Sequence, residues 1–172
     1  MKKTGVLLAV AGVYALVGGQ AQAQIMEMNG TWALNKDLSF PKAQCEYLHY
    51  TVTADEEHYI VDEISNDGKK FNTEYRAKFD GKEHPNKNLV TGEVNYVKVQ
   101  KVLDRVEQVT NIRHDKSADG KEVSVIRGYY IRLLSLDGKQ ISSVLTSVRP
   151  DGSLQVTGVR VFDKVEGKKP KC

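Results

Sequence analysis

The sequence contains few of the residues and motifs on which metal, cofactor or catalytic sites are usually built. Its 172 residues include two cysteines, four histidines and one tryptophan, and the cysteines do not form a Cys-x-x-Cys motif. Zinc needs several such ligands at suitable spacings, so no metal site is expected. Glycine-rich phosphate loops, nucleophile motifs and paired-carboxylate signatures are also missing. We therefore expect no cofactor, and a binding or structural role is favoured over an enzymatic one.

An excess of charge of one sign is missing as well. Lys and Arg number 25 against 22 Asp and Glu, which gives a formal net charge of +3. Nucleic-acid binding and attachment to an anionic membrane normally require a strong basic patch, so neither partner is expected. The hydrophobic content of 40% is ordinary for a globular protein.

One long apolar run is present, at the N-terminus. Val6–Val17 is uncharged and mostly apolar, follows Lys2 and Lys3, and precedes the small-x-small sequence Ala21-Gln22-Ala23. The run is too short to cross about 30 Å of hydrocarbon, and this order is typical of a secretory signal peptide. We therefore predict a signal peptide over residues 1–23, cleavage after Ala23, a periplasmic or secreted protein, and no integral membrane segment after cleavage.

The rest of the chain is predicted to form a single domain over residues 24–165, followed by a basic tail over residues 166–172. Cys45 and Cys172 both follow the leader. In an oxidising compartment a lone pair usually forms a disulfide, which here would tie the tail to an early strand. Closing so long a loop is worth about 4–5 kcal/mol in the chain-entropy model. The alternative is two free thiols.

Turn signals divide the predicted domain into short segments. Asp-Gly steps favour the tight turns of β-hairpins, and five are present, at residues 67–68, 80–81, 119–120, 137–138 and 151–152. The segments between them are rich in Val, Ile, Tyr and Thr, and Phe71–Phe79 alternates apolar with polar residues. About nine strands with no crossover helix indicate an antiparallel meander. We predict an all-β, up-and-down barrel of about 8–10 strands, because closure removes exposed edges; a two-sheet sandwich is the alternative.

Both ends of the meander carry a family resemblance. Gly30-Thr31-Trp32 resembles the Gly-x-Trp signature that opens the lipocalins and the fatty-acid-binding proteins, and Val159–Lys164 resembles the last strand of the fatty-acid-binding branch. The chain is also similar to small exported bacterial proteins, without an assigned role, that begin with a Gly-Thr-Trp segment. This resemblance implies a calycin-like barrel. It further implies that Trp32 packs structurally across the closed end, with Arg160 lying over it or reaching into the cavity. The segment 36–44 is too short for the two-helix lid of the fatty-acid-binding branch.

Alternation gives the candidate binding residues. Arg127 lies in register with Val123, Val125, Tyr129 and Ile131, and Arg160 shares its register with Val156 and Phe162. An arginine facing an apolar interior needs a carboxylate from the protein or from a ligand. One interpretation is therefore a ligand site in which these arginines hold the acid group of an amphipathic molecule, with hydroxyl groups from Tyr75 and Tyr129. The alternatives are that an arginine faces solvent or that Arg160 stacks on Trp32.

Three functions remain open from the sequence. The favoured one is an exported barrel that binds a small apolar or amphipathic molecule in its interior. The second is a lyase or isomerase that uses the Tyr- and His-rich hairpin around His49 and His58. The third is a structural or interaction protein of the cell envelope whose barrel is filled by its own side chains.

Overall fold

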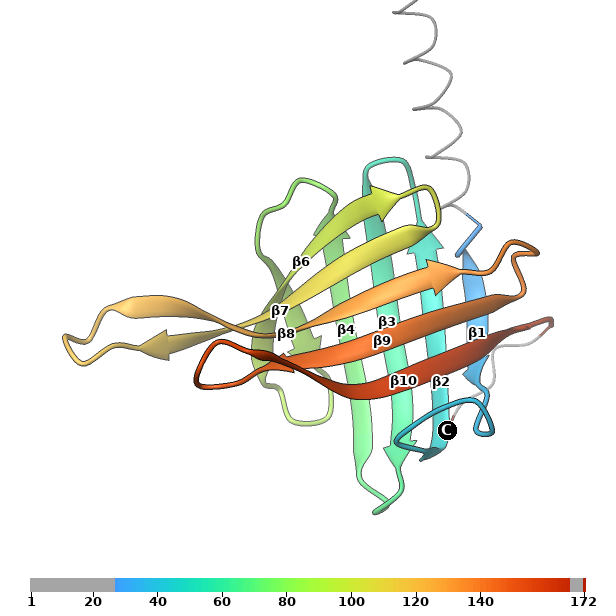
Figure 1. Ribbon diagram of the computed structural model, residues 1–172, viewed down its shortest axis with the longest axis horizontal. Helices are drawn as coiled ribbons and strands as arrows, with labels where there is room; N and C mark the ends of the chain where they lie inside the picture. Colours follow the sequence, from blue (N-terminus) through green and yellow to red (C-terminus); the bar gives the residue numbers. More distant parts are fainter. Residues whose placement is uncertain (1–26, 168–171) are drawn as a thin grey trace, which may run out of the picture.

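The structure, a computed structural model, describes residues 27–167 and Cys172. Each strand pairs with its neighbours in sequence, and the first pairs with the last, so that ten antiparallel strands form a closed barrel (Figure 1). The strands are β1 Gly30–Leu34, β2 Ala43–Val52, β3 Glu56–Ser65, β4 Lys70–Lys78, β5 His84–Asn88, β6 Val94–Leu103, β7 Val106–Lys116, β8 Glu122–Leu134, β9 Gln140–Val148 and β10 Leu154–Val165. The expected all-β up-and-down barrel is confirmed.

Several details around this barrel were expected and others were not. The glycines of all five Asp-Gly steps have positive φ, between 68° and 81°, and four of these steps lie in hairpin turns. The short strand β5 was not predicted, because Glu83–Asn88 is polar and contains Pro85.

The expected signal peptide, residues 1–23, lies outside the described residues, as does most of the tail, residues 168–171. Within the part of the chain that the structure describes, no helix is long and apolar enough to cross a membrane.

One end of the barrel is closed by an apolar plug. Trp32, on β1, is fully buried and its Nε1 donates a hydrogen bond to the Met28 carbonyl oxygen at 2.8 Å. Buried apolar side chains from the surrounding strands pack with it: Met28, Val52, Ala77, Val99, Leu134, Ile141 and Phe162. We call this the Trp32 end. The opposite end carries the turns at residues 66–69, 89–93 and 149–153.

The tail is attached to the outside of the barrel by the expected disulfide. Cys45 of β2 is bonded to Cys172, 127 residues further along the sequence. The backbone N–H of Cys172 also donates to Asp62 Oδ2 on the neighbouring strand β3, at 3.1 Å. A disulfide is consistent with export to an oxidising compartment.

The β7–β8 hairpin extends beyond the barrel wall. Asn111 pairs with Gly128 but Ile112 pairs with Ile126, so Arg127 is an extra residue, a β-bulge. Beyond the bulge, residues 113–125 form a two-stranded arm that projects away from the barrel, on the left of Figure 1. This bulge decides which side chains of β8 point into the barrel.

Candidate functional site: the barrel interior

The inner wall carries charged groups among apolar ones. On β2 the inward residues are Glu46, Leu48, Tyr50 and Val52, which are buried and alternate with more exposed neighbours. The inward residues of β3, β7, β8 and β10 continue this mixture and include Glu57, Tyr59, Glu63, Glu107, Tyr130, Arg132, Arg160 and Phe162. Because a charge inside a barrel is costly unless it is paired, the partners of these groups decide what the interior can bind.

Arg132 is the centre of a fully buried network near the Trp32 end. Its Nη1 donates to Glu107 Oε1 at 2.7 Å and to Tyr75 Oη at 3.0 Å. Tyr75 Oη in turn donates to Glu57 Oε1 at 2.5 Å, and the same Arg132 nitrogen lies 3.6 Å from that carboxylate oxygen. The guanidinium also stacks on the Tyr59 ring, 4.2 Å from its centroid. Arg132 Nη1 and the side of the guanidinium that faces Tyr59 are therefore engaged by the protein.

Glu57 is the carboxyl group of this network whose protonated form is favoured. Burial, with the nearby Glu107 carboxyl group, raises the pKa of Glu57 well above its ordinary value, whereas Arg132 acts in the opposite direction. Glu107 is the carboxyl group in closest contact with the guanidinium. The positive charge of Arg132 thus has its acidic partners within the protein.

Arg160 forms a second network toward the opposite end. Its Nε lies 3.3 Å from Glu46 Oε2 and its Nη2 lies 3.6 Å from Glu63 Oε1, and its Nη1 donates to the Pro41 carbonyl oxygen. Burial and the neighbouring Glu63 raise the pKa of Glu46 to about 7, although Arg160 lowers it. Burial also raises the pKa of Glu63. Here two carboxyl groups share one guanidinium.

A cavity of about 220 Å³ lies between the two networks. Its wall is mixed: apolar and aromatic residues, both arginines, two glutamates, and the polar side chains of Thr73, Asn86, Asn111 and Ser143. Toward the opposite end, the lining includes Phe71, which is 38% exposed, and Glu63, whose side chain is 19% exposed. The cavity therefore reaches solvent beside the β3–β4 turn, away from the apolar plug.

Some buried polar atoms of the lining make no hydrogen bond within the described part of the chain, although one of them, Glu46 Oε2, is ion-paired with Arg160. Glu46 Oε2, Asn86 Oδ1 and Asn111 Nδ2 are buried without a well-aligned hydrogen bond. Buried polar atoms are normally satisfied, so such atoms in a cavity wall indicate where a bound molecule or water is held. Two of the three are oxygens that accept hydrogen bonds.

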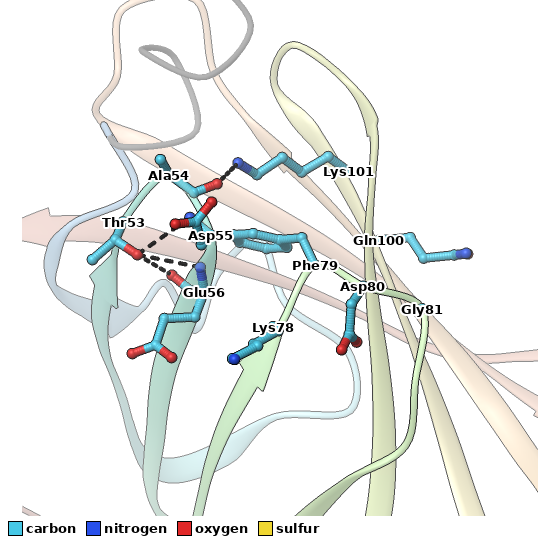
Figure 2. A pocket seen from close by; sticks show the side chains of 10 residues that line it. All are labelled: Thr53, Ala54, Asp55, Glu56, Lys78, Phe79, Asp80, Gly81, Gln100 and Lys101. Atoms are coloured by element: carbon cyan, nitrogen blue, oxygen red, sulfur yellow. Dashed lines mark hydrogen bonds between the residues drawn. The ribbon is translucent and has the colours of Figure 1, made fainter.

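A wider and more open hollow lies outside the plug, at the Trp32 end. It is bounded by the β2–β3 turn at residues 53–55, the end of β4 and the end of β6 (Figure 2). Figure 2 shows Lys101 reaching to the Ala54 carbonyl oxygen, to which its Nζ donates at 3.0 Å. The same ammonium lies 4.1 Å from the centroid of the Phe79 ring. The ammonium group of Lys101 is thus already bound to the protein. The hollow is therefore a weaker candidate for a ligand site than the interior cavity.

The predicted binding residues divide between the two faces of the wall. Tyr75 and Arg160 line the cavity, as expected, but Arg127 is exposed and Tyr129 lines a groove on the outer surface. The expectation that the Arg127 register faces the interior is wrong for this stretch of β8. The bulge at Arg127 shifts the alternation, so the inward residues after it are Gly128, Tyr130, Arg132 and Leu134.

The positions that the family resemblance implies for Trp32 and Arg160 can be compared with the structure. Trp32 packs in the closed end, and Arg160 reaches into the cavity. The cation over the Trp32 ring is Lys164, whose Nζ lies 5.1 Å from its centroid. Arg160 therefore does not act as the cap for Trp32; its guanidinium binds carboxylates instead.

Both histidines of the Tyr- and His-rich hairpin lie on the outer surface. His58 Nε2 is paired with Glu74 at 2.6 Å, and His49 Nδ1 lies 3.0 Å from Thr31 Oγ1. The tyrosines next to them in sequence, Tyr50 and Tyr59, point inward. This arrangement removes the geometric basis for a lyase or isomerase site that combines these imidazoles with the cavity. No cluster of potential metal ligands occurs among residues 27–167 and Cys172.

Glu46, Glu57, Glu63, Glu107 and Arg132 were not identified from the sequence. A signal was available, since each shares its alternation with apolar residues, as Arg127 does. Glu46 lies in register with Leu48 and Tyr50, and Glu107 lies in register with Val109. What the sequence lacks is the cross-strand register that brings Glu107 opposite Arg132.

Comparison with known proteins adds no functional assignment. The chain matches no protein-family model, and a search of curated proteins finds no match. The closed antiparallel barrel is compatible with a calycin-like fold, and this is the level at which the chain can be classified.

Proposed function

We propose that this protein is an exported, calycin-like barrel of the lipocalin and fatty-acid-binding kind that holds a small, partly apolar molecule in its interior cavity. The observation that carries the proposal is the cavity itself, about 220 Å³, whose wall combines apolar and aromatic side chains with charged and polar ones, some of whose buried atoms make no hydrogen bond. Ligand sites typically combine a mostly apolar wall with a few polar groups that orient the ligand.

The cavity volume limits the size of the ligand. It is smaller than the roughly 300–1,000 Å³ of sites for drug-sized molecules. It exceeds the roughly 150 Å³ of an engineered protein cavity that binds benzene. A molecule with a single ring or a short chain fits this volume, whereas a long acyl chain does not. The export signal over residues 1–23 and a periplasmic or secreted location belong to the same proposal.

The first test is native mass spectrometry of the protein purified from its own host, which looks for a co-purified small molecule. A matched pair of variants on β9 assigns any such molecule to the cavity. Leu145→Trp fills the cavity, whereas Val144→Trp adds the same bulk on the outer surface. We expect the molecule to be lost from the first variant and kept by the second, with both folded by circular dichroism. Equal retention by both variants would place the ligand elsewhere and contradict the proposal.

A filled barrel with a structural role is the second candidate. It is favoured by the Arg132 network, which occupies the interior between the cavity and the Trp32 end with the protein's own side chains. In that case neither native purification nor a ligand screen finds a bound molecule, and Leu145→Trp is destabilising because a filled interior has no room for the larger side chain.

A further inference from the structure

Arg160, Glu46 and Glu63 form a charged part of the cavity wall. Their charges indicate which class of ligand the cavity can bind. Arg160, at one wall, faces Glu46 and Glu63, and its Nη1 donates to the Pro41 carbonyl oxygen. Two carboxyl groups of the protein thus already face the single positive charge of Arg160. A ligand carboxylate would add a third acidic group beside one cation, which is unfavourable in a buried site.

The carboxyl groups of the same network are not saturated. Glu46 is 8% exposed, yet its Oε2 has no well-aligned hydrogen bond within the described chain. Asn86 Oδ1, elsewhere in the same lining, is a second acceptor without a donor. A ligand that brings N–H groups satisfies these two oxygens, whereas a carboxylate could accept only from Asn111 Nδ2, the single donor among the three atoms.

We propose that the cavity selects a molecule bearing a protonated amine, and that the ammonium group binds Glu46 beside Arg160. This inference rests on the proposed function, because it specifies the chemistry of the ligand held in that cavity. When Glu46 and Glu63 are both ionised, the single guanidinium leaves one negative charge uncompensated, and the ammonium supplies the missing positive charge.

Binding of the amine is linked to a proton. The groups that face Glu46 are Glu63 from β3 and Arg160 from β10, with the hydroxyls of Tyr59 and Tyr130 nearby. Burial and Glu63 raise the pKa of Glu46 to about 7. Below that pH Glu46 carries a proton, which must leave to solvent before the carboxylate can pair with the ammonium. The affinity for an amine therefore rises with pH until Glu46 is ionised.

Three ring-sized probes of similar shape test the charge preference: benzylamine, benzyl alcohol and benzoate, titrated into the full protein by calorimetry. At about pH 8 we expect benzylamine to bind about tenfold more tightly than benzyl alcohol, and benzoate to bind most weakly. Between about pH 6 and about pH 8 the affinity for benzylamine rises about tenfold, while that for benzyl alcohol is constant.

A matched pair of variants locates the effect. Glu46→Gln keeps the shape of the side chain and removes its charge, so benzylamine loses both its advantage over benzyl alcohol and its pH dependence. Glu93→Gln makes the same change on the exposed surface and leaves both unchanged.

The outcomes separate the inference from the function on which it rests. If all three probes bind alike, or benzoate binds most tightly, the amine preference is overturned while the cavity remains a binding site. Retention of the preference in Glu46→Gln also overturns the assignment to Glu46. If none of the three binds, both the preference and the proposal of a ring-sized ligand fail.

Discussion

Glu107 on β7 and Arg132 on β8 are direct cross-strand partners, joined by a 2.7 Å hydrogen bond inside the closed barrel. Neither side chain is more than 2% exposed. The second carboxyl of the network, Glu57, reaches Arg132 from the opposite side through Tyr75. Burial raises the pKa of Glu57, whereas Glu107 contacts the guanidinium directly, so the two glutamates are expected to respond differently to substitution.

Replacement of the two glutamates by glutamine is expected to have unequal effects. Glu107→Gln removes the charge that neutralises Arg132 and should lower the free energy of unfolding by about 3–5 kcal/mol. Glu57→Gln should lower it by less than about 1 kcal/mol, because the raised pKa of Glu57 favours an uncharged side chain, which glutamine resembles. Urea denaturation at neutral pH measures both, and equal losses would contradict the assigned charges.

The stability of the protein is expected to depend on pH through Glu46. Burial raises the pKa of this group from 4.5 to about 7, so the folded protein keeps a proton that the unfolded chain releases. Stability from this source is fully present below about pH 4.5, falls as the pH rises to about 7, and is constant above that. The total loss is about 3 kcal/mol. Unfolding free energies of the wild type and Glu46→Gln should therefore diverge over this range, and parallel curves would refute the shift.

Gly128 follows the bulge and lies against the neighbouring strand. A Cβ built on it would lie 1.9 Å from the Thr146 carbonyl oxygen of β9, so Gly128→Ala must push the two strands apart. We expect a loss of about 1–3 kcal/mol or more in thermal or chemical denaturation. Arg127→Ala, at the adjacent exposed position, is the control and should change stability by less than about 0.5 kcal/mol. A tolerated alanine at position 128 would contradict the close approach.

The Cys45–Cys172 disulfide closes a loop of most of the domain. Its removal in Cys45→Ser/Cys172→Ser is expected to lower the free energy of unfolding by about 4–5 kcal/mol, mainly because the unfolded chain regains freedom. Denaturation with and without a reductant measures this difference in the wild type. The double variant should not respond to the reductant.

The sequence was sufficient for the fold because local signals determine an antiparallel meander. The Asp-Gly turns and the alternation of Phe71–Phe79 are short-range features, and both are present in the structure. The strand β5 escaped prediction because its pairing with β4 and β6, rather than its own residues, holds it in the sheet.

The candidate site was less predictable, since it depends on register across strands. Arg160 and Tyr75 line the cavity, as one of the alternatives left open by the sequence required, and the disulfide was correctly paired. On β8 both faces are rich in apolar residues, so alternation alone does not show which face is inward. Because of the bulge at Arg127, the residues predicted to point inward after it point outward, and their neighbours point inward. The carboxylate that pairs with Arg160 was expected to come from the protein or from a ligand. The structure shows that the protein provides it, through Glu46 and Glu63.

The arm formed by residues 113–125 has a consequence for association. Pairing with β6 ends at Ile112 and pairing with β9 ends at Gly128, so beyond these points the arm pairs across its own two strands. Its outer edges leave backbone donors and acceptors available as a template for a strand from another molecule, which the closed barrel itself does not provide. The charged residues Arg113, Asp115, Lys116, Lys121 and Glu122 line this hairpin. Such charges oppose edge-to-edge pairing, so neutralising them is expected to promote association of barrels through the arm.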